Sequence, residues 1–212
     1  MWAETQGLNL TPFLQRTRRP ALQSLFFPLS APERIAAINA EFRAAAHLRH
    51  FSLAGVAELQ AWKPEALVLP LGTALTLAEH GLRGLPDLPS LSTAIVVLTS
   101  YDDTPVNAYH RDCLWRVFAV PVFEQLRGWD GNVIARECEV HDGLHVDESL
   151  GRFSLEGNEL LVMQPFVPQA PPARTGLSGE IVTAHCECGA ETPRLCNLMR
   201  LDKAPKASSA AA

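Results

Sequence analysis

Residues 94–98 read Ala-Ile-Val-Val-Leu and form the most strand-like stretch of the chain. β-Branched residues favour strands, and a short run that is apolar throughout is typical of a strand buried on both faces. The runs Ala66–Leu69 and Val120–Phe123 have the same character on either side of it. We therefore predict three buried strands, over 66–69, 94–98 and 120–123.

Segments with helical spacing lie before and between these strands. Thr73–His80 is followed by Gly81, a residue type that often ends helices. Pro105–Phe118 and Leu53–Trp62 have the same periodicity, and Pro64 limits the latter. Strands that alternate with helices indicate right-handed βαβ units on a parallel sheet.

A fourth helix is predicted over residues 31–48. Ser30 suits the N-cap position, and Pro32 is tolerated in a first helical turn. Apolar residues then recur at roughly helical spacing, at Ile35, Ile38, Phe42 and Leu48. Residues 1–30 are punctuated by prolines, which predicts an irregular N-terminal arm.

The pattern changes after about residue 130, where glycines separate short segments. Leu144–Val146, Glu159–Met163 and Glu180–Thr183 are predicted strands, and proline-rich Gln164–Gly176 is a predicted surface loop. The expected fold class is α/β, with βαβ units on a mainly parallel sheet followed by a small antiparallel β subdomain. The expected regions are an arm (1–30), an α/β region (31–130), a β-rich region (131–202) and a disordered, low-complexity tail (203–212).

Composition excludes several classes of protein. The chain has 212 residues, 47% hydrophobic and 19% charged, so it can bury a core. Its formal net charge of −5 argues against broad binding to nucleic acid or to an anionic membrane. No apolar run approaches the roughly 20 residues of a spanning helix, and the N-terminus lacks a secretory pattern, so we expect a cytoplasmic protein. Five cysteines there are more typical of metal ligands or core thiols than of disulfides.

Four soft ligands fall in two clusters, which predicts a zinc site. Cys138 and His145 bracket a short loop, and Cys186 and Cys188 lie in a Cys-x-Cys-Gly turn that can present two thiolates on one side. Zinc prefers thiolate and imidazole in a tetrahedral shell, so these residues would form a Cys₃His site that knots the β-rich region. Local spacing leaves open whether His141, His185 or Cys196 replaces one of them. It also leaves open a simpler reading, with reduced thiols and surface histidines around a glycine-rich turn.

Together these segments resemble a known family. Residues 88–98, 115–125, 135–146 and 186–195 resemble successive segments in the middle part of the phenylacetate–coenzyme A ligase family, within the acyl-adenylate-forming (AMP-binding) superfamily. Some members of that family hold zinc with the cysteine and histidine of the third segment and both cysteines of the fourth. The resemblance therefore implies Cys138, His145, Cys186 and Cys188 as the zinc ligands.

The chain also departs from that family at positions tied to catalysis. It lacks a phosphate-binding loop upstream of about residue 50 and a C-terminal lid with a catalytic lysine. The adenine-side turn is reduced to residues 126–130, where the resemblance implies Asp130 as a poor Mg²⁺ ligand. In the ribose-binding segment it implies Arg174 as a nucleotide contact, but Leu177 replaces the expected aspartate. Adenylation depends on positioned phosphates, Mg²⁺ and a cation, so we expect the isolated chain not to ligate acids.

Our leading hypothesis is a non-catalytic, zinc-stabilised remnant of this ligase fold. It would bind a small acyl or aromatic ligand, or a partner protein or second copy covering surface that missing domains leave apolar. The alternative is one subunit of a split adenylating ligase, whose phosphate loop and lid come from another chain. A hydrolytic zinc enzyme ranks lower, because three thiolates and an imidazole close the metal shell.

Overall fold

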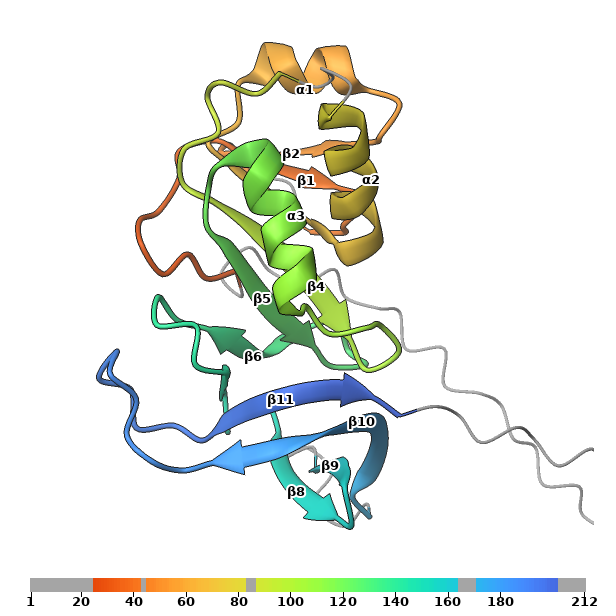
Figure 1. Ribbon diagram of the computed structural model, residues 1–212, viewed down its shortest axis with the longest axis vertical. Helices are drawn as coiled ribbons and strands as arrows, with labels where there is room; N and C mark the ends of the chain where they lie inside the picture. The colour runs from red at the N-terminus through yellow and green to blue at the C-terminus, as the bar shows by residue number, and fades with distance from the viewer. Residues whose placement is uncertain (1–24, 43–44, 83–86, 164–170, 202–212) are drawn as a thin grey trace, which may run out of the picture.

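The computed structural model describes residues 25–42, 45–82, 87–163 and 171–201. Within them, eleven strands form one sheet in the order β2-β1-β3-β4-β5-β6-β7-β11-β10-β9-β8 (Figure 1). The first five strands are β1 (Ile35–Ile38), β2 (Leu48–Phe51), β3 (Ala66–Pro70), β4 (Ala94–Ser100) and β5 (Val122–Arg127). They pair in parallel, as the βαβ pattern predicts.

Three helices cover one face of this parallel half: α1 (Val56–Trp62), α2 (Leu71–Gly81) and α3 (Ala108–Phe118). Each connects two strands in the same direction across the sheet, and right-handed crossovers in one direction place their helices on one face. The connection from β1 to β2 runs the opposite way, so it lies on the other face. There Phe42 is fully buried and packs in a cluster with Val68 and Val96.

The predicted helix over 31–48 is wrong. The structure has β1, an irregular connection and β2 in that region. All four residues of Ile35–Ile38 are buried, because β1 pairs with both β2 and β3 and is covered on both faces. Ile35 and Ile38 are three residues apart, so a strand that is apolar throughout also satisfied the helical spacing.

The other helices of this half are confirmed, with shifted ends. α1 begins at Val56 instead of Leu53, and α2 begins directly after Pro70. α3 begins at Ala108 because Asn107 caps it: the His110 amide donates to the Asn107 side chain at 3.0 Å, and His110 Nδ1 accepts from the Asn107 amide.

The second half of the sheet is antiparallel from the β5–β6 pair onward. Its strands are β6 (Val133–Glu137), β7 (Leu144–Val146), β8 (Arg152–Glu156), β9 (Glu159–Met163), β10 (Ala173–Val182) and β11 (Arg194–Arg200). β7 and β9 have the predicted bounds, and the predicted strand over 180–183 is the end of β10. The expected fold class is confirmed.

Part of the predicted loop 164–176 is also strand. Residues 173–176 belong to β10, while 164–170 lie outside the described residues, as do residues 1–24 and the predicted tail.

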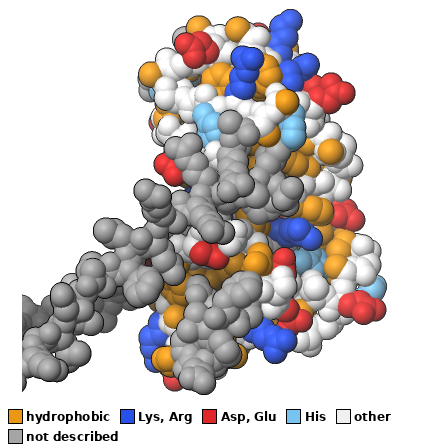
Figure 2. Space-filling model, turned by 180° about the vertical axis from the view of Figure 1, so that it is seen from behind, with side chains coloured by type: hydrophobic (Ala, Val, Ile, Leu, Met, Phe, Trp, Pro, Cys, Tyr) orange, Lys and Arg blue, Asp and Glu red, His pale blue; other side chains and the backbone are white. Residues whose placement is uncertain are grey.

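In the part of the chain that the structure describes, no helix is long and apolar enough to cross a membrane. Acidic and basic side chains are interspersed on the face that Figure 2 shows.

Candidate metal centre

The four predicted metal ligands come from strand β7 and from the two loops that it brings together. β7 pairs with β6 on one side and with β11 on the other, and His145 on β7 lies opposite both Arg136 and Arg194. Cys138 directly follows β6, and Cys186 and Cys188 lie in the β10–β11 loop. The short central strand therefore brings two distant segments of sequence side by side.

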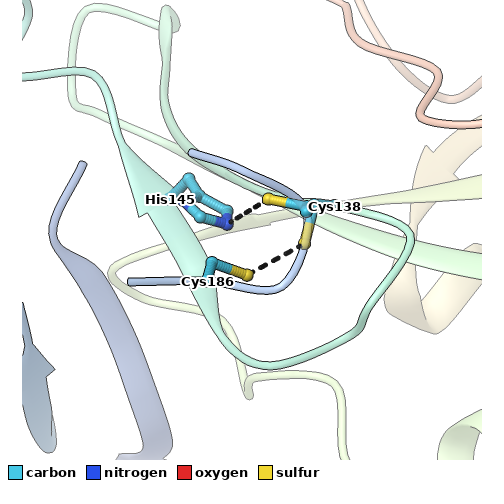
Figure 3. Close-up of side chains that lie close together, drawn as sticks. Cys138, His145 and Cys186 are labelled. Atoms are coloured by element: carbon cyan, nitrogen blue, oxygen red, sulfur yellow. Dashed lines mark hydrogen bonds between the residues drawn. The ribbon is translucent and has the colours of Figure 1, made fainter. Parts of the chain in front are cut away.

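These four side chains form a compact group. One sulfur or nitrogen atom from each lies within 4.8 Å of the others. Cys138 Sγ is 3.8 Å from Cys186 Sγ, and Cys188 Sγ is 3.4 Å from His145 Nε2. Figure 3 shows Cys138, His145 and Cys186 pointing toward one another. Cys138, Cys186 and His145 are buried and Cys188 is half-buried, so the group could hold a metal ion such as zinc.

The Cys186–Gly189 turn depends on a left-handed backbone. Gly189 has φ of +87°, and its amide donates to the Cys186 carbonyl at 2.9 Å. A residue with a side chain is strained at such a φ, and glycine is not. The turn thereby presents Cys186 and Cys188 to the same point, as the sequence predicts.

His145 is oriented as a metal ligand requires. Its Nδ1 lies 3.1 Å from Thr192 Oγ1, which leaves Nε2 facing Cys188. Burial lowers the pKa of His145, and the nearby Arg194 and Arg136 lower it further. These surroundings favour the neutral imidazole, which is the form that binds a metal ion.

The surroundings shift the pKa values of Cys138 and Cys186 in opposite directions. Burial raises the pKa of Cys138 to about 12. Burial also acts to raise the pKa of Cys186, but hydrogen bonds from Cys188 and Cys138 and the charge of Arg194 lower it overall. A divalent metal binds thiolates and displaces their protons, so metal affinity here should rise with pH.

Arg194 ties the two ligand loops to each other. Its guanidinium donates to the Asp142 carbonyl at 3.0 Å, forms an ion pair with the Asp142 carboxylate, and donates to the Ala184 carbonyl at 3.3 Å. Asp142 belongs to the first loop and Ala184 to the second. Sequence reasoning assigned no role to Arg194 or Thr192, although both lie beside the Cys-x-Cys-Gly turn.

The three alternative ligands do not join the group, which has only four members among the described residues. The His141 ring stacks on Phe123 at 4.7 Å between centroids, and its Nδ1 lies 3.6 Å from Glu137. His185 is exposed. Cys196 contacts the Asp142 carbonyl and lies beside Gly143 instead.

The two residues that the resemblance implies for nucleotide binding lie apart from the metal ligands in the fold. Asp130 lies in the β5–β6 turn, where it accepts from the amide and side chain of Asn132 at 3.0 and 2.7 Å. Arg174 lies on β10 and forms ion pairs with Glu156 and Glu159. Their role in nucleotide binding stays a prediction.

Comparison with known proteins identifies the fold. No family model matches the chain, and no curated protein does. Among solved structures, 2-hydroxyisobutyryl-CoA ligase in complex with 2-HIB-AMP and CoA superposes with a TM-score of 0.60 at 12% identity, over 80% of this chain and 45% of the ligase. The chain has the fold of part of an acyl-CoA ligase. A mutant form of coronafacic acid ligase from Pectobacterium brasiliense gives a TM-score of 0.53 at 8% identity, over 79% of this chain and 39% of that ligase. The chain therefore spans less than half the length of these adenylate-forming ligases.

Proposed function

We propose that this chain is a zinc-stabilised, non-catalytic protein on a ligase fold of the phenylacetate–coenzyme A ligase type, and that it binds a partner protein or a small acyl or aromatic ligand. The observation that carries the proposal is the convergence of three thiols and one imidazole from segments 48 residues apart. A metal ion bound by this group would stabilise the fold, and that role does not depend on ligation.

The donor set supports a structural zinc. Three thiolates and a neutral imidazole complete a tetrahedral shell, which leaves no position for an activated water. Thr192 and Arg194 supply the outer contacts that hold such ligands in place. The complex carries a charge of about −1, partly balanced by the Arg194 guanidinium.

The positions tied to nucleotide binding support the loss of ligation. Leu177 stands where the resemblance implies a ribose-binding carboxylate, and it is buried in the core of the antiparallel half. An apolar side chain there leaves the ribose hydroxyls without acceptors, at a cost of roughly 1–3 kcal/mol each. Arg174 is already bound to two glutamates.

Metal analysis and a ligation assay on one preparation test both halves of the proposal. We expect about one zinc per chain, no saturable ATP binding, and no acyl-adenylate or acyl-CoA when acids, ATP and CoA are supplied. Zinc-free protein with unchanged thermal stability would contradict the structural half. Acyl-CoA formed by the purified chain would contradict the non-catalytic half.

A split ligase is the second candidate, because this chain spans 45% of the 2-hydroxyisobutyryl-CoA ligase chain. A partner polypeptide would then supply the phosphate loop and lid. Under this candidate, a partner co-purifies from the cytoplasm of the native cell and only the mixture makes acyl-CoA. Activity of the mixture that does not change on Asp130→Ala or Arg174→Ala would argue against it.

A further inference from the structure

A cavity of about 340 Å³ lies between the start of α3, β5, the β6–β7 loop and β11. Six ionisable side chains line it: Arg111, Glu124, Glu137, His141, Asp142 and Cys196. Val106, Leu144 and Leu198 supply apolar wall. Its volume falls in the range of small-molecule sites, and neither the metal group nor the proposed function uses it.

The cations around this cavity are already bound to partners within the protein. Arg111 donates to Glu137 at 2.7 Å and to the Val122 carbonyl at 2.5 Å. Arg194, behind the cavity wall, forms the ion pair with Asp142. An incoming anion would have to break one of these pairs, so the cavity disfavours a carboxylate ligand.

Glu124 is the carboxyl group whose cationic neighbour, Arg111, is hydrogen-bonded to another carboxylate, that of Glu137. It is 4% exposed, and its oxygens accept from Thr99 Oγ1 at 2.8 Å and from the Val106 amide at 3.2 Å. Among the described residues it forms no ion pair, although it lines the cavity. Burial raises its pKa to about 7, and the charge of Glu137 adds to that shift. When Glu124 is ionised, three carboxylates lie around the cavity against the guanidiniums of Arg111 and Arg194, an excess of one negative charge, and a bound cation would favour that ionised form.

We propose that this cavity binds a small organic monocation, whose ammonium group pairs with Glu124 while its apolar part lies on Val106, Leu144 and Leu198. A bare metal ion fits less well. Within the described residues, only the cysteine–histidine group brings three or more ligand atoms close enough to hold one. A single ammonium needs one carboxylate and an apolar wall, and the cavity has both.

Three probes of similar size and different charge test the proposal on the full chain. Phenethylamine, 2-phenylethanol and phenylacetate are titrated at neutral pH by calorimetry, and the site is mapped by amide chemical shifts. We expect the amine to bind at least tenfold more tightly than the alcohol and the acid to bind most weakly, with shifts centred on Glu124, His141 and Cys196. No amine binding at millimolar concentration, or shifts centred elsewhere, would overturn the proposal.

Glu124→Gln and the surface control Glu79→Gln isolate the charge. Glu124→Gln should lose the tenfold preference for amine over alcohol, whereas Glu79→Gln, at an exposed position of helix α2, should keep it. An unchanged preference in Glu124→Gln would refute the pairing. If that variant does not fold, the chemical-shift map of the wild-type protein and the order of affinity of the three probes still test the proposal. Zinc content is measured on the same samples, so that the outcome for amine binding can be distinguished from the outcome for the metal proposal.

Discussion

Replacing Cys186 by serine tests the metal centre most directly. Cys186 is 1% exposed, and its Sγ atom lies 3.8 Å from Cys138 Sγ. Serine keeps the size and polarity of the side chain but is a poor zinc ligand at neutral pH. The substitution therefore removes one ligand of four with little change in packing.

The magnitude follows from the coupling between metal binding and folding. Structural zinc contributes about 10–16 kcal/mol of apparent binding free energy in small domains, all of it available to the folded state. If the loss of one ligand removes only about 3 kcal/mol of that, the melting temperature of a chain of 150–250 residues falls by about 6–12 °C. We expect Cys188→Ser to behave in the same way.

Differential scanning calorimetry with zinc analysis measures both effects. Cys196→Ser is the matched control, because Cys196 is a half-buried cysteine outside the ligand group. It should keep its zinc and melt within about 2 °C of the parent. The reasoning fails if both ligand variants melt like the parent with full zinc, and the ligand assignment fails if Cys196→Ser releases the metal.

Three further predictions concern Arg194 and Gly189 beside the candidate metal centre and Glu124 at the cavity. Arg194→Lys should lower the stability by about 1–3 kcal/mol in denaturant unfolding and weaken zinc binding in a chelator competition, because lysine cannot reach both ligand loops at once. Gly189→Ala should cost about 1–2 kcal/mol and also weaken zinc binding, whereas Gly72→Ala, at an open helical position, should not destabilise the protein. The raised pKa of Glu124 means that the folded state holds this proton more tightly than the unfolded state, so its contribution to stability falls as pH rises from about 4.5 to about 7. Unfolding titrations across that range should show a loss of about 3 kcal/mol that Glu124→Gln lacks, and parallel curves for the two proteins would contradict this.

The buried parallel strands and the cysteine–histidine group could be predicted from sequence because their signals are local. β3 and the first five residues of β4 are short apolar runs, and β4 is also rich in β-branched residues, which is typical of buried strands. Cysteine and histidine are rare, so two clusters of them constrain the site even before the loops are placed. β1 has the same kind of signal, but its two alanines weaken the β-branched pattern and its isoleucines also fit a helix.

The missed strands and contacts depend on residues far away in the sequence. β6 ends in Arg136 and Glu137, two charged residues that argue against a buried strand. Glu137 is nevertheless buried, because it accepts from Arg111 on α3 and from the Glu124 amide. β8 is exposed along most of its length, so alternation could not reveal it. Arg194 acquires its role only when the two ligand loops lie side by side, and no local sequence pattern predicts that contact.

A metal ion held by these four residues would stabilise the sheet at a point that takes no part in any ligation chemistry. The continuity of the sheet between its parallel and antiparallel halves passes through β7, which has three residues. Backbone pairing of so short a strand is weak, since Leu144 and His145 alone are in register with β11. Cys138 precedes β7, His145 lies on it, and Cys186 and Cys188 precede β11, so one ion would fasten β6, β7 and β11 at this short strand. A requirement for a stable sheet would then constrain these four residues independently of any ligation chemistry, and it would put no such constraint on Leu177 or Asp130.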